Sequence, residues 1–166
     1  TKDGWFKTGD IAEWTANGHL KVIDRKKNLV KTMNGEYIAL EKLESVYRSN
    51  KYVMNICCYA DQTKVKAVGI VVPVFPQLAK LAISLGVMKQ GDDVEQYVDN
   101  PKLANAVLSD ILKTGRDQGL TGIELLQGVV LFDDEWTPEN GYVTSAQKLK
   151  RKDILHAVQK RVDKVY

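Results

Sequence analysis

Two residues near the start of the chain carry groups suited to binding a sugar or a phosphate. Asp10 follows Thr8-Gly9, where we expect a short strand to stop and expose the carboxylate. The two oxygens of a carboxylate accept hydrogen bonds from two adjacent hydroxyls, which suits a ribose diol. The planar guanidinium of Arg25 can hold the same sugar or a phosphate. Taken singly, both also have ordinary explanations, because aspartates cap turns and surface arginines are solvated.

A glycine turn, Asn34-Gly35, lies just before a stretch with helical periodicity. Glycine adopts a positive φ without strain and lets the backbone approach a thin ligand closely. Lys31 and Glu36 flank the turn, and a surface ion pair between them would explain both residues about as well as a binding role. A simple turn is therefore the alternative to a loop that faces a ligand.

Lys148 is a further candidate for a functional residue. We expect it on an exposed loop between the turn signal at residues 137–141 and the last helix. A lysine there can deliver a compact positive charge to a site formed elsewhere. Residues 148–166 hold seven basic and two acidic residues, a net charge of +5 against +3 for the whole chain. A solvated helix face explains this charge. Nucleic-acid binding competes with it, but no aromatic residues are interleaved with the basic ones, so we expect no nucleic-acid partner.

The composition is that of one globular domain. The 166 residues are 44% hydrophobic and 27% charged, which is enough apolar content for a buried core. No run reaches the roughly 18 apolar residues of a membrane span, and no secretory leader opens the chain, so we expect an intracellular protein. The chain begins at Thr1 in turn-like sequence without a methionine, which leads us to expect a segment of a longer polypeptide.

Residues that commonly bind metals are few. Cys57 and Cys58 are adjacent in an apolar run, a poor arrangement for a disulfide or a tetrahedral metal site, and we predict buried thiols in a reducing compartment. His19 and His156 are the only histidines, so neither a His-centred metal site nor a Ser/His/Asp triad is expected. A glycine-rich phosphate loop is also missing from the sequence.

The elements that must position these residues fall into two parts. We predict an antiparallel ribbon from strands at residues 6–8 and 19–23, joined through Asn17-Gly18, a strong hairpin signal. Residues 24–28 have no apolar side chain and are predicted to be a linker or hinge. Residues 29–166 alternate strands and helices, which indicates a compact α+β unit.

Periodicity predicts the elements of this second part. A helix at residues 39–49 has apolar residues at helical spacing: Leu40, Leu43, Val46 and Tyr47. Its opposite, solvated face is expected to carry the charged residues Glu41, Lys42, Glu44 and Arg48. Further helices are predicted at residues 77–85, 102–118 and 152–165, the second opened by Asn100 and Pro101. Strands are predicted at residues 53–60 and 67–74, which pair as a hairpin, and at 128–132.

The order of the motifs resembles the fatty acyl-CoA synthetase signature of the adenylate-forming enzymes. The resemblance lies in DGWFKTGDI at residues 3–11, GHLKVIDRKKNLVK at 18–31 and NGEYIALEKLE at 34–44. TSAQKLKR at residues 144–151 resembles the catalytic-lysine loop of the same enzymes. The resemblance extends through essentially the whole chain, least in residues 75–127, and is strongest to the fungal long-chain fatty acid–CoA ligases.

This resemblance implies a division of the chain and a reaction. Residues 1–27 would be the last ribbon of a large adenylation domain plus the hinge. Residues 28–166 would be a mobile, luciferase-like carboxyl-terminal domain with a short mixed sheet flanked by helices. The full-length enzyme would activate a fatty acid with ATP as an acyl-adenylate and then transfer the acyl group to CoA. Asp10 and Arg25 would bind the AMP ribose, and Lys27 would be the hinge residue.

The resemblance assigns different residues to the two steps. Lys148 would bridge the carboxylate and the phosphate during adenylation, whereas Lys31, Asn34 and Gly35 would line the path of CoA during thioester formation. A placed ammonium would neutralise the like charges that meet in the first step. The phosphate loop, the acyl tunnel and the Mg²⁺ site would belong to the preceding large domain. We therefore predict that the 166 residues alone are inactive.

Two other functions fit the same residues. A non-catalytic module could bind an anionic membrane surface or nucleic acid through the basic tail, with an affinity that falls steeply as salt rises. An enzyme of the same class could instead act on a shorter or aromatic acid, although Asp24-Arg25-Lys26-Lys27 favours fatty acyl substrates by resemblance. The full-length protein is expected in the cytoplasm or peripherally on endoplasmic reticulum, lipid droplets or peroxisomes.

Overall fold

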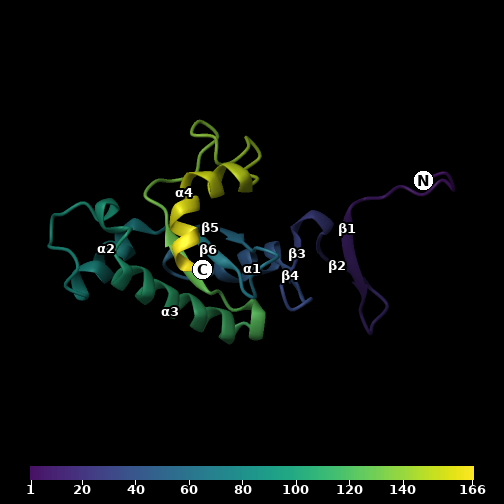
Figure 1. Cartoon of the computed structure of the whole chain (residues 1–166), viewed down its shortest axis with the longest axis horizontal. Coiled ribbons are helices and arrows are strands. Elements are labelled where there is room, and N and C mark those ends of the chain that lie inside the picture. Colours follow the sequence, from purple (N-terminus) through teal and green to yellow (C-terminus); the bar gives the residue numbers. More distant parts are fainter.

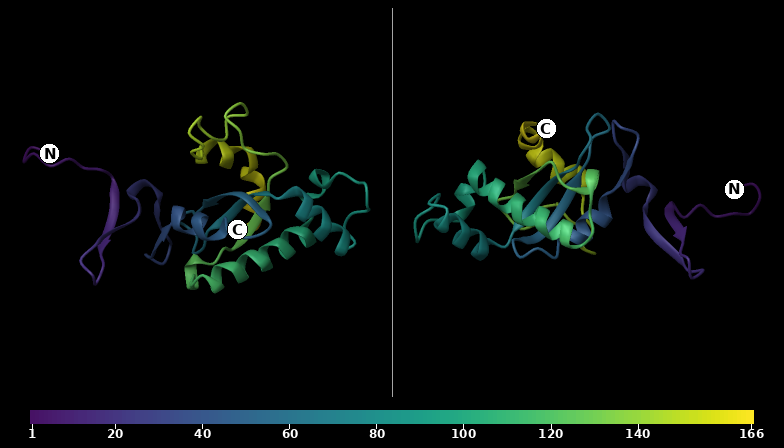
Figure 2. Two further views of the ribbon diagram at one scale, coloured as in Figure 1. Left: turned by 180° about the vertical axis from the view of Figure 1, so that it is seen from behind. Right: turned by 90° about the horizontal axis from the view of Figure 1, so that it is seen from below.

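A two-stranded ribbon forms the amino-terminal end of the chain, which the computed structural model describes over residues 1–166. β1 (Asp10–Trp14) and β2 (Leu20–Arg25) pair antiparallel around Asn17-Gly18, where Gly18 has a φ of 76°. The predicted hairpin is therefore confirmed. Figures 1 and 2 show this ribbon standing apart from the rest of the chain in every view.

The first strand of the ribbon begins later than predicted. Residues 6–8 lie outside every strand, and Asp10 begins β1 instead of following a strand. Gly9 has a φ of 79°, which interrupts an extended run through this point. The register partner of Asp10 is Arg25, so β1 starts where the end of β2 offers it a partner.

A short connection leads from the ribbon into the body of the protein. The 3₁₀ turn η1 (Lys26–Asn28) is followed by β3 (Leu29–Lys31) and β4 (Tyr37–Ala39), which pair antiparallel. α1 (Leu40–Tyr47) then begins directly after β4. The sequence predicted α1 but not this second, shorter hairpin.

A mixed three-stranded sheet forms the centre of the body. β5 (Val53–Tyr59) pairs antiparallel with β6 (Val68–Pro73), as predicted, and β6 pairs in parallel with β7 (Gly128–Leu131). Every residue of β6 is buried, which is expected for a central strand covered on both faces. The predicted α+β class, with a short mixed sheet flanked by helices, is confirmed.

The long connection between β6 and β7 is mainly helical. It contains α2 (Phe75–Ser84), η2 (Val94–Tyr97), α3 (Pro101–Asp117) and η3 (Gly122–Glu124). Asn100 Oδ1 accepts hydrogen bonds from the backbone N–H of Lys102 at 3.0 Å and of Leu103 at 3.3 Å, and so caps α3 as predicted. None of the helices has the length and the apolar content needed to span a bilayer.

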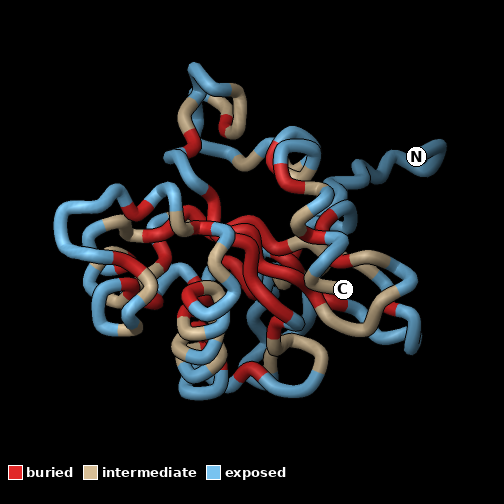
Figure 3. Tube along the Cα trace, turned by 60° about the vertical axis from the view of Figure 1, so that its left-hand side comes forward, coloured by how far each residue is buried: buried red, intermediate tan, exposed pale blue.

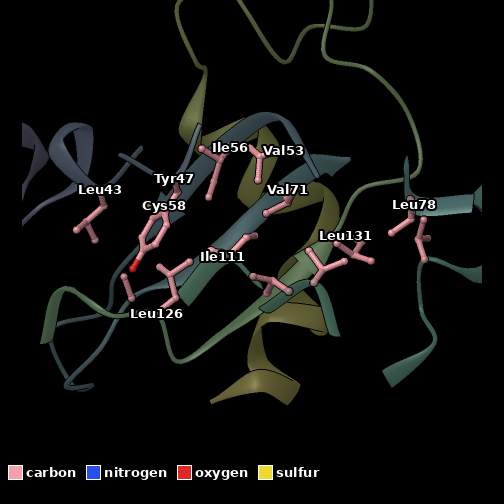
Figure 4. Packing of buried hydrophobic residues seen from close by; sticks show 14 of the residues in the cluster. Leu43, Tyr47, Val53, Ile56, Cys58, Val71, Leu78, Ile111, Leu126 and Leu131 are labelled. Carbon is pink, nitrogen blue, oxygen red and sulfur yellow. The ribbon is translucent and has the colours of Figure 1, made fainter. Parts of the chain in front are cut away.

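Helices cover both faces of the sheet. α1 and α3 pack on one face, and α4 (Arg151–Val165) packs on the other. Because neighbouring residues of a strand point to opposite faces, Cys57 packs with the α4 side and Cys58 with the α1 and α3 side. Figure 3 shows the buried strands at the centre, and Figure 4 shows Tyr47, Ile111 and Val71 in the larger cluster. The predicted buried thiols are confirmed.

Candidate functional site

An open basin of about 1010 Å³ lies where η1, α1 and the residues that begin α4 meet. We call it the basic basin because of the charges that line it. Its basic residues are Arg25, Lys27, Arg48, Lys148, Lys150, Arg151 and Lys152. Its acidic residues are Glu41, Glu44 and Asp153. A concave surface with this excess of positive charge attracts anions.

Three of the predicted site residues line the basic basin. Arg25 and Lys27 come from the predicted hinge, and Lys148 comes from the other end of the chain. Asp10 joins them through Arg25, whose Nε lies 3.2 Å from Asp10 Oδ1 across the ribbon. Both side chains of this pair are partly exposed, so it adds little stability and leaves their other polar atoms accessible to a ligand.

Buried polar side chains fix the segment that carries Arg25 and Lys27 to α1. Residues 24–28, predicted as a linker, are not all solvated, because Asp24 and Asn28 are buried. Asp24 Oδ2 accepts a hydrogen bond of 3.0 Å from the backbone N–H of Glu41 in the first turn of α1. A carboxylate at this position satisfies a free helix N–H and interacts favourably with the helix dipole.

Lys148 lies in a tight loop with its side chain exposed, as predicted. The loop is closed by an antiparallel bridge between Val143 and Leu149. The Thr144 N–H donates to the carbonyl of Lys148 at 2.9 Å, and the Lys148 N–H donates to Thr144 Oγ1 at 3.1 Å. Gln147 completes the turn with a φ of 59°, which is uncommon for a residue with a Cβ.

The site contains a buried ion pair that was not predicted from the sequence. Glu44, predicted on the solvated face of α1, is 4% exposed and binds Arg151, whose Nη2 lies 2.8 Å from Glu44 Oε2. Burial alone would lower the pKa of Arg151, but the hydrogen bond and the charge of Glu44 raise it further above its usual range. A signal was present, because Glu44 lies four residues after Leu40 and three before Tyr47, on the buried face.

The remaining candidates lie on the β3–β4 hairpin and do not line the basic basin. Asn34-Gly35 forms its turn, in which the Gly35 N–H donates to the Thr32 carbonyl at 2.9 Å and Gly35 has a φ of 83°. The ion pair considered between Lys31 and Glu36 does not form. The Lys31 ammonium lies 6.0 Å from the centre of the Tyr37 ring instead.

Comparison with known proteins bears on the sequence resemblance. No family model matches the chain. The chain is 72% identical to long-chain-fatty-acid–CoA ligase 1 of Saccharomyces cerevisiae and 52% identical to the ligase of the same name from Schizosaccharomyces pombe. Each match covers 100% of this chain, but only 24% and 25% of the respective relative. The chain is homologous to part of the long-chain fatty acid–CoA ligases. It spans about a quarter of their length.

The fold of this chain is similar to part of solved adenylation domains. The A domain of carboxylic acid reductase from Segniliparus rugosus, in complex with AMP and a carboxylic acid, is 26% identical with a TM-score of 0.81. The match covers 100% of this chain and 24% of that one. ATP-bound MatB from Rhodopseudomonas palustris shares the fold, with a TM-score of 0.56 at 16% identity over 98% of this chain and 26% of that one.

Metal-binding groups do not gather anywhere in this chain. No three His, Cys, Asp or Glu side chains are arranged to hold a metal ion. The two thiols are also poor ligands, because burial raises the pKa of Cys57 to about 12 and that of Cys58 well above its usual value. The side chains of this chain therefore form no cage that could hold a metal ion by protein ligands alone.

Proposed function

We propose that this chain is the carboxyl-terminal part of a long-chain fatty acid–CoA ligase. The full-length protein activates a fatty acid with ATP as an acyl-adenylate, releases pyrophosphate, and transfers the acyl group to CoA. Homology to the yeast ligases supports this proposal. The observation that carries it is the basic basin, where Arg25, Lys27 and Lys148 meet from distant parts of the chain.

In this proposal residues 1–27 are the last ribbon and hinge of a large adenylation domain, and residues 28–166 are the mobile domain. The exposed apolar side chains of residues 1–27 support the division. Trp5 and Trp14 are both 74% exposed, and Val22 is 61% exposed. Exposed apolar side chains of this size indicate a surface that another part of a larger protein covers. Lys27, within η1, is the hinge residue.

Asp10, Arg25 and Lys148 serve the adenylation step. Asp10 accepts hydrogen bonds from the ribose hydroxyls, and Arg25, held beside it, binds the same sugar. The fatty acid carboxylate attacks the α-phosphorus of ATP, and pyrophosphate leaves. Because carboxylate and triphosphate repel each other, the ammonium of Lys148 lowers the barrier by neutralising charge as they approach.

Lys31, Asn34 and Gly35 serve the thioester step. They lie on the β3–β4 hairpin and do not line the basic basin, so a different face of the domain can meet the acyl-adenylate. The thiol of CoA attacks the acyl carbon, and AMP leaves. The backbone at Gly35 has a φ of 83°, at which a residue with a Cβ would be strained, and that Cβ would lie 3.8 Å from Lys31 Cε. Glycine keeps this turn thin enough for CoA to pass.

The isolated 166 residues are inactive in this proposal, because the phosphate loop, acyl tunnel and Mg²⁺ site belong to the rest of the full-length protein. No step here depends on a metal held by this chain. Turnover of palmitate, ATP and CoA by the isolated chain would contradict the prediction.

The test measures the two steps separately in the full-length protein with Lys148→Ala. Palmitate-dependent pyrophosphate release should fall by about 10²–10³-fold, the usual effect of removing one group that stabilises transition-state charge. Thioester formation from supplied palmitoyl-adenylate should survive. Lys160→Ala is the control, because Lys160 is an exposed lysine of α4 that does not line the basin.

The outcomes separate the assignments. A folded full-length protein without palmitate-dependent pyrophosphate release would remove the fatty acyl ligase assignment, and release with a shorter or aromatic acid instead would redirect it to that substrate. An undiminished Lys148→Ala variant would remove only the role of Lys148. Binding of the chain to anionic vesicles or nucleic acid that falls steeply with salt, without any ligase activity, would favour the non-catalytic module.

A further inference from the structure

Glu44 and Arg151 form a buried pair directly beside the Lys148 loop. Both terminal nitrogens of Arg151 donate to Glu44, one to each carboxylate oxygen. This bidentate geometry fixes the orientation of the guanidinium as well as its position. The side chains are 25% and 6% exposed, respectively, so solvent competes little for the contact.

The same pair also binds the backbone of Cys58 at the open edge of the sheet. β5 is an edge strand, since the strand order is β5-β6-β7. Glu44 Oε1 accepts a 2.7 Å hydrogen bond from the Cys58 N–H, and Arg151 Nη1 donates to the Cys58 carbonyl at 3.4 Å. The pair therefore satisfies backbone groups that a further strand would otherwise satisfy. This anchors Arg151 to the sheet as well as to α1.

Arg151 is also the point at which the Lys148 loop ends. It is the first residue of α4 and follows Lys148 by three positions. The other end of the connection lies at the hinge, where Asp24 accepts a hydrogen bond from the first turn of α1. One short helix, α1, thus holds both the hinge segment and the start of α4, and both segments line the basic basin.

We propose that Glu44 and Arg151 are positioning residues that set the ammonium of Lys148 relative to the hinge, and that they serve the adenylation step. This inference rests on the proposed function, in which Lys148 acts in that step. Stability alone gives little reason for such a pair, because apolar side chains of similar volume often stabilise a core as well or better. A displacement of about 1 Å at a reacting group, by contrast, can lower a rate about 100-fold.

The test uses two conservative variants of the full-length protein. Arg151→Lys keeps the charge but loses the planar fork, and Glu44→Gln keeps an acceptor for Cys58 but loses the charge. The kcat of palmitate-dependent pyrophosphate release should fall about 10- to 100-fold, while thioester formation from supplied palmitoyl-adenylate stays within about twofold. A merely structural role would lower both steps together.

Arg161→Lys is the matched control. Arg161 lies on the same helix, its side chain is also 25% exposed, and it binds Asp99 and the carbonyl of Leu131. It does not line the basic basin. Arg161→Lys should lower the unfolding temperature about as much as Arg151→Lys does. Its pyrophosphate release and its thioester formation should change to the same extent. Step-selective loss in Arg161→Lys would overturn the inference.

The remaining outcomes distinguish this inference from the proposed function. Loss of both steps to the same extent in Arg151→Lys and Glu44→Gln, or no loss, would overturn the inference while Lys148→Ala still shows step-selective loss. A Lys148→Ala variant without such loss would overturn the role proposed for Lys148 and, with it, this inference, while the ligase assignment would stand. If the single variants fail to fold, the double variant Glu44→Gln with Arg151→Met, which leaves no unpaired charge, replaces them. Normal pyrophosphate release in that double variant would refute the positioning role.

Discussion

Breaking the Glu44–Arg151 pair from one side should destabilise the chain strongly. Arg151→Met leaves the carboxylate of Glu44, 4% exposed, with the Cys58 N–H as its remaining donor. Removing one partner of a buried pair costs about 3–5 kcal/mol. Because the Arg151 side chain is 25% exposed, some water reaches the site, and we expect the lower end of this range, about 3 kcal/mol.

The double variant should be less destabilised than the two single variants predict. Glu44→Gln alone is expected to cost about 2 kcal/mol, because it leaves a partly solvated guanidinium without its counterion. Glu44→Gln combined with Arg151→Met removes both charges and retains an acceptor for the Cys58 N–H. Its cost should also be about 2 kcal/mol, so the pair shows a coupling of about 3 kcal/mol.

Urea denaturation of the 166-residue chain at pH 7, followed by far-ultraviolet circular dichroism, measures all four free energies of unfolding. Equal slopes with urea concentration would show that the variants change stability and not the extent of unfolding. A loss below about 1 kcal/mol for Arg151→Met, or single effects that simply add, would show that the pair is not energetically coupled in the folded protein.

Two further predictions concern the core. Gly115→Ala should destabilise the chain by about 1 kcal/mol in urea, because overpacking outweighs the gain in helix propensity; its Cβ would lie 2.8 Å from Cε1 of the buried Tyr47, and a stabilised variant would show that this ring moves aside easily. The urea midpoint should also fall as pH rises from 9 to 12, because burial raises the pKa of the Cys57 thiol from 9.0 to about 12. The contribution of the neutral thiol to stability is complete below pH 9 and is lost progressively as the pH rises to about 12. Cys57→Ala should flatten this decline, and an unchanged decline would assign it to other groups.

Local chemistry determined much of the fold. Asn17-Gly18 indicated the ribbon turn, Asn100 and Pro101 indicated the start of α3, and helical spacing indicated the buried face of α1. These signals act within a few residues, so they can be identified without the tertiary structure. The strand expected at residues 6–8 was wrong because a strand also needs a partner, and β2 offers one from Asp10 onward.

The site was only partly accessible from the sequence. The motif order indicated Asp10, Arg25, Lys27 and Lys148 one by one, and the pairing of Asp10 with Arg25 depends on the register of a ribbon. That Arg25, Lys27 and Lys148 surround one basin could not be predicted, because they come together only when α1 and the start of α4 pack beside η1.

Buried charges show most clearly what only the tertiary structure decided. Glu44 was predicted on the solvated face of α1 because it is charged, although its helical spacing from Leu40 and Tyr47 fits the buried face. The counterion that allows its burial lies 107 residues away. Asp24 likewise finds its donor 17 residues away, at the start of α1. The sequence determined which residues are charged, but burying a charge depends on a partner that long-range packing brings within hydrogen-bond distance.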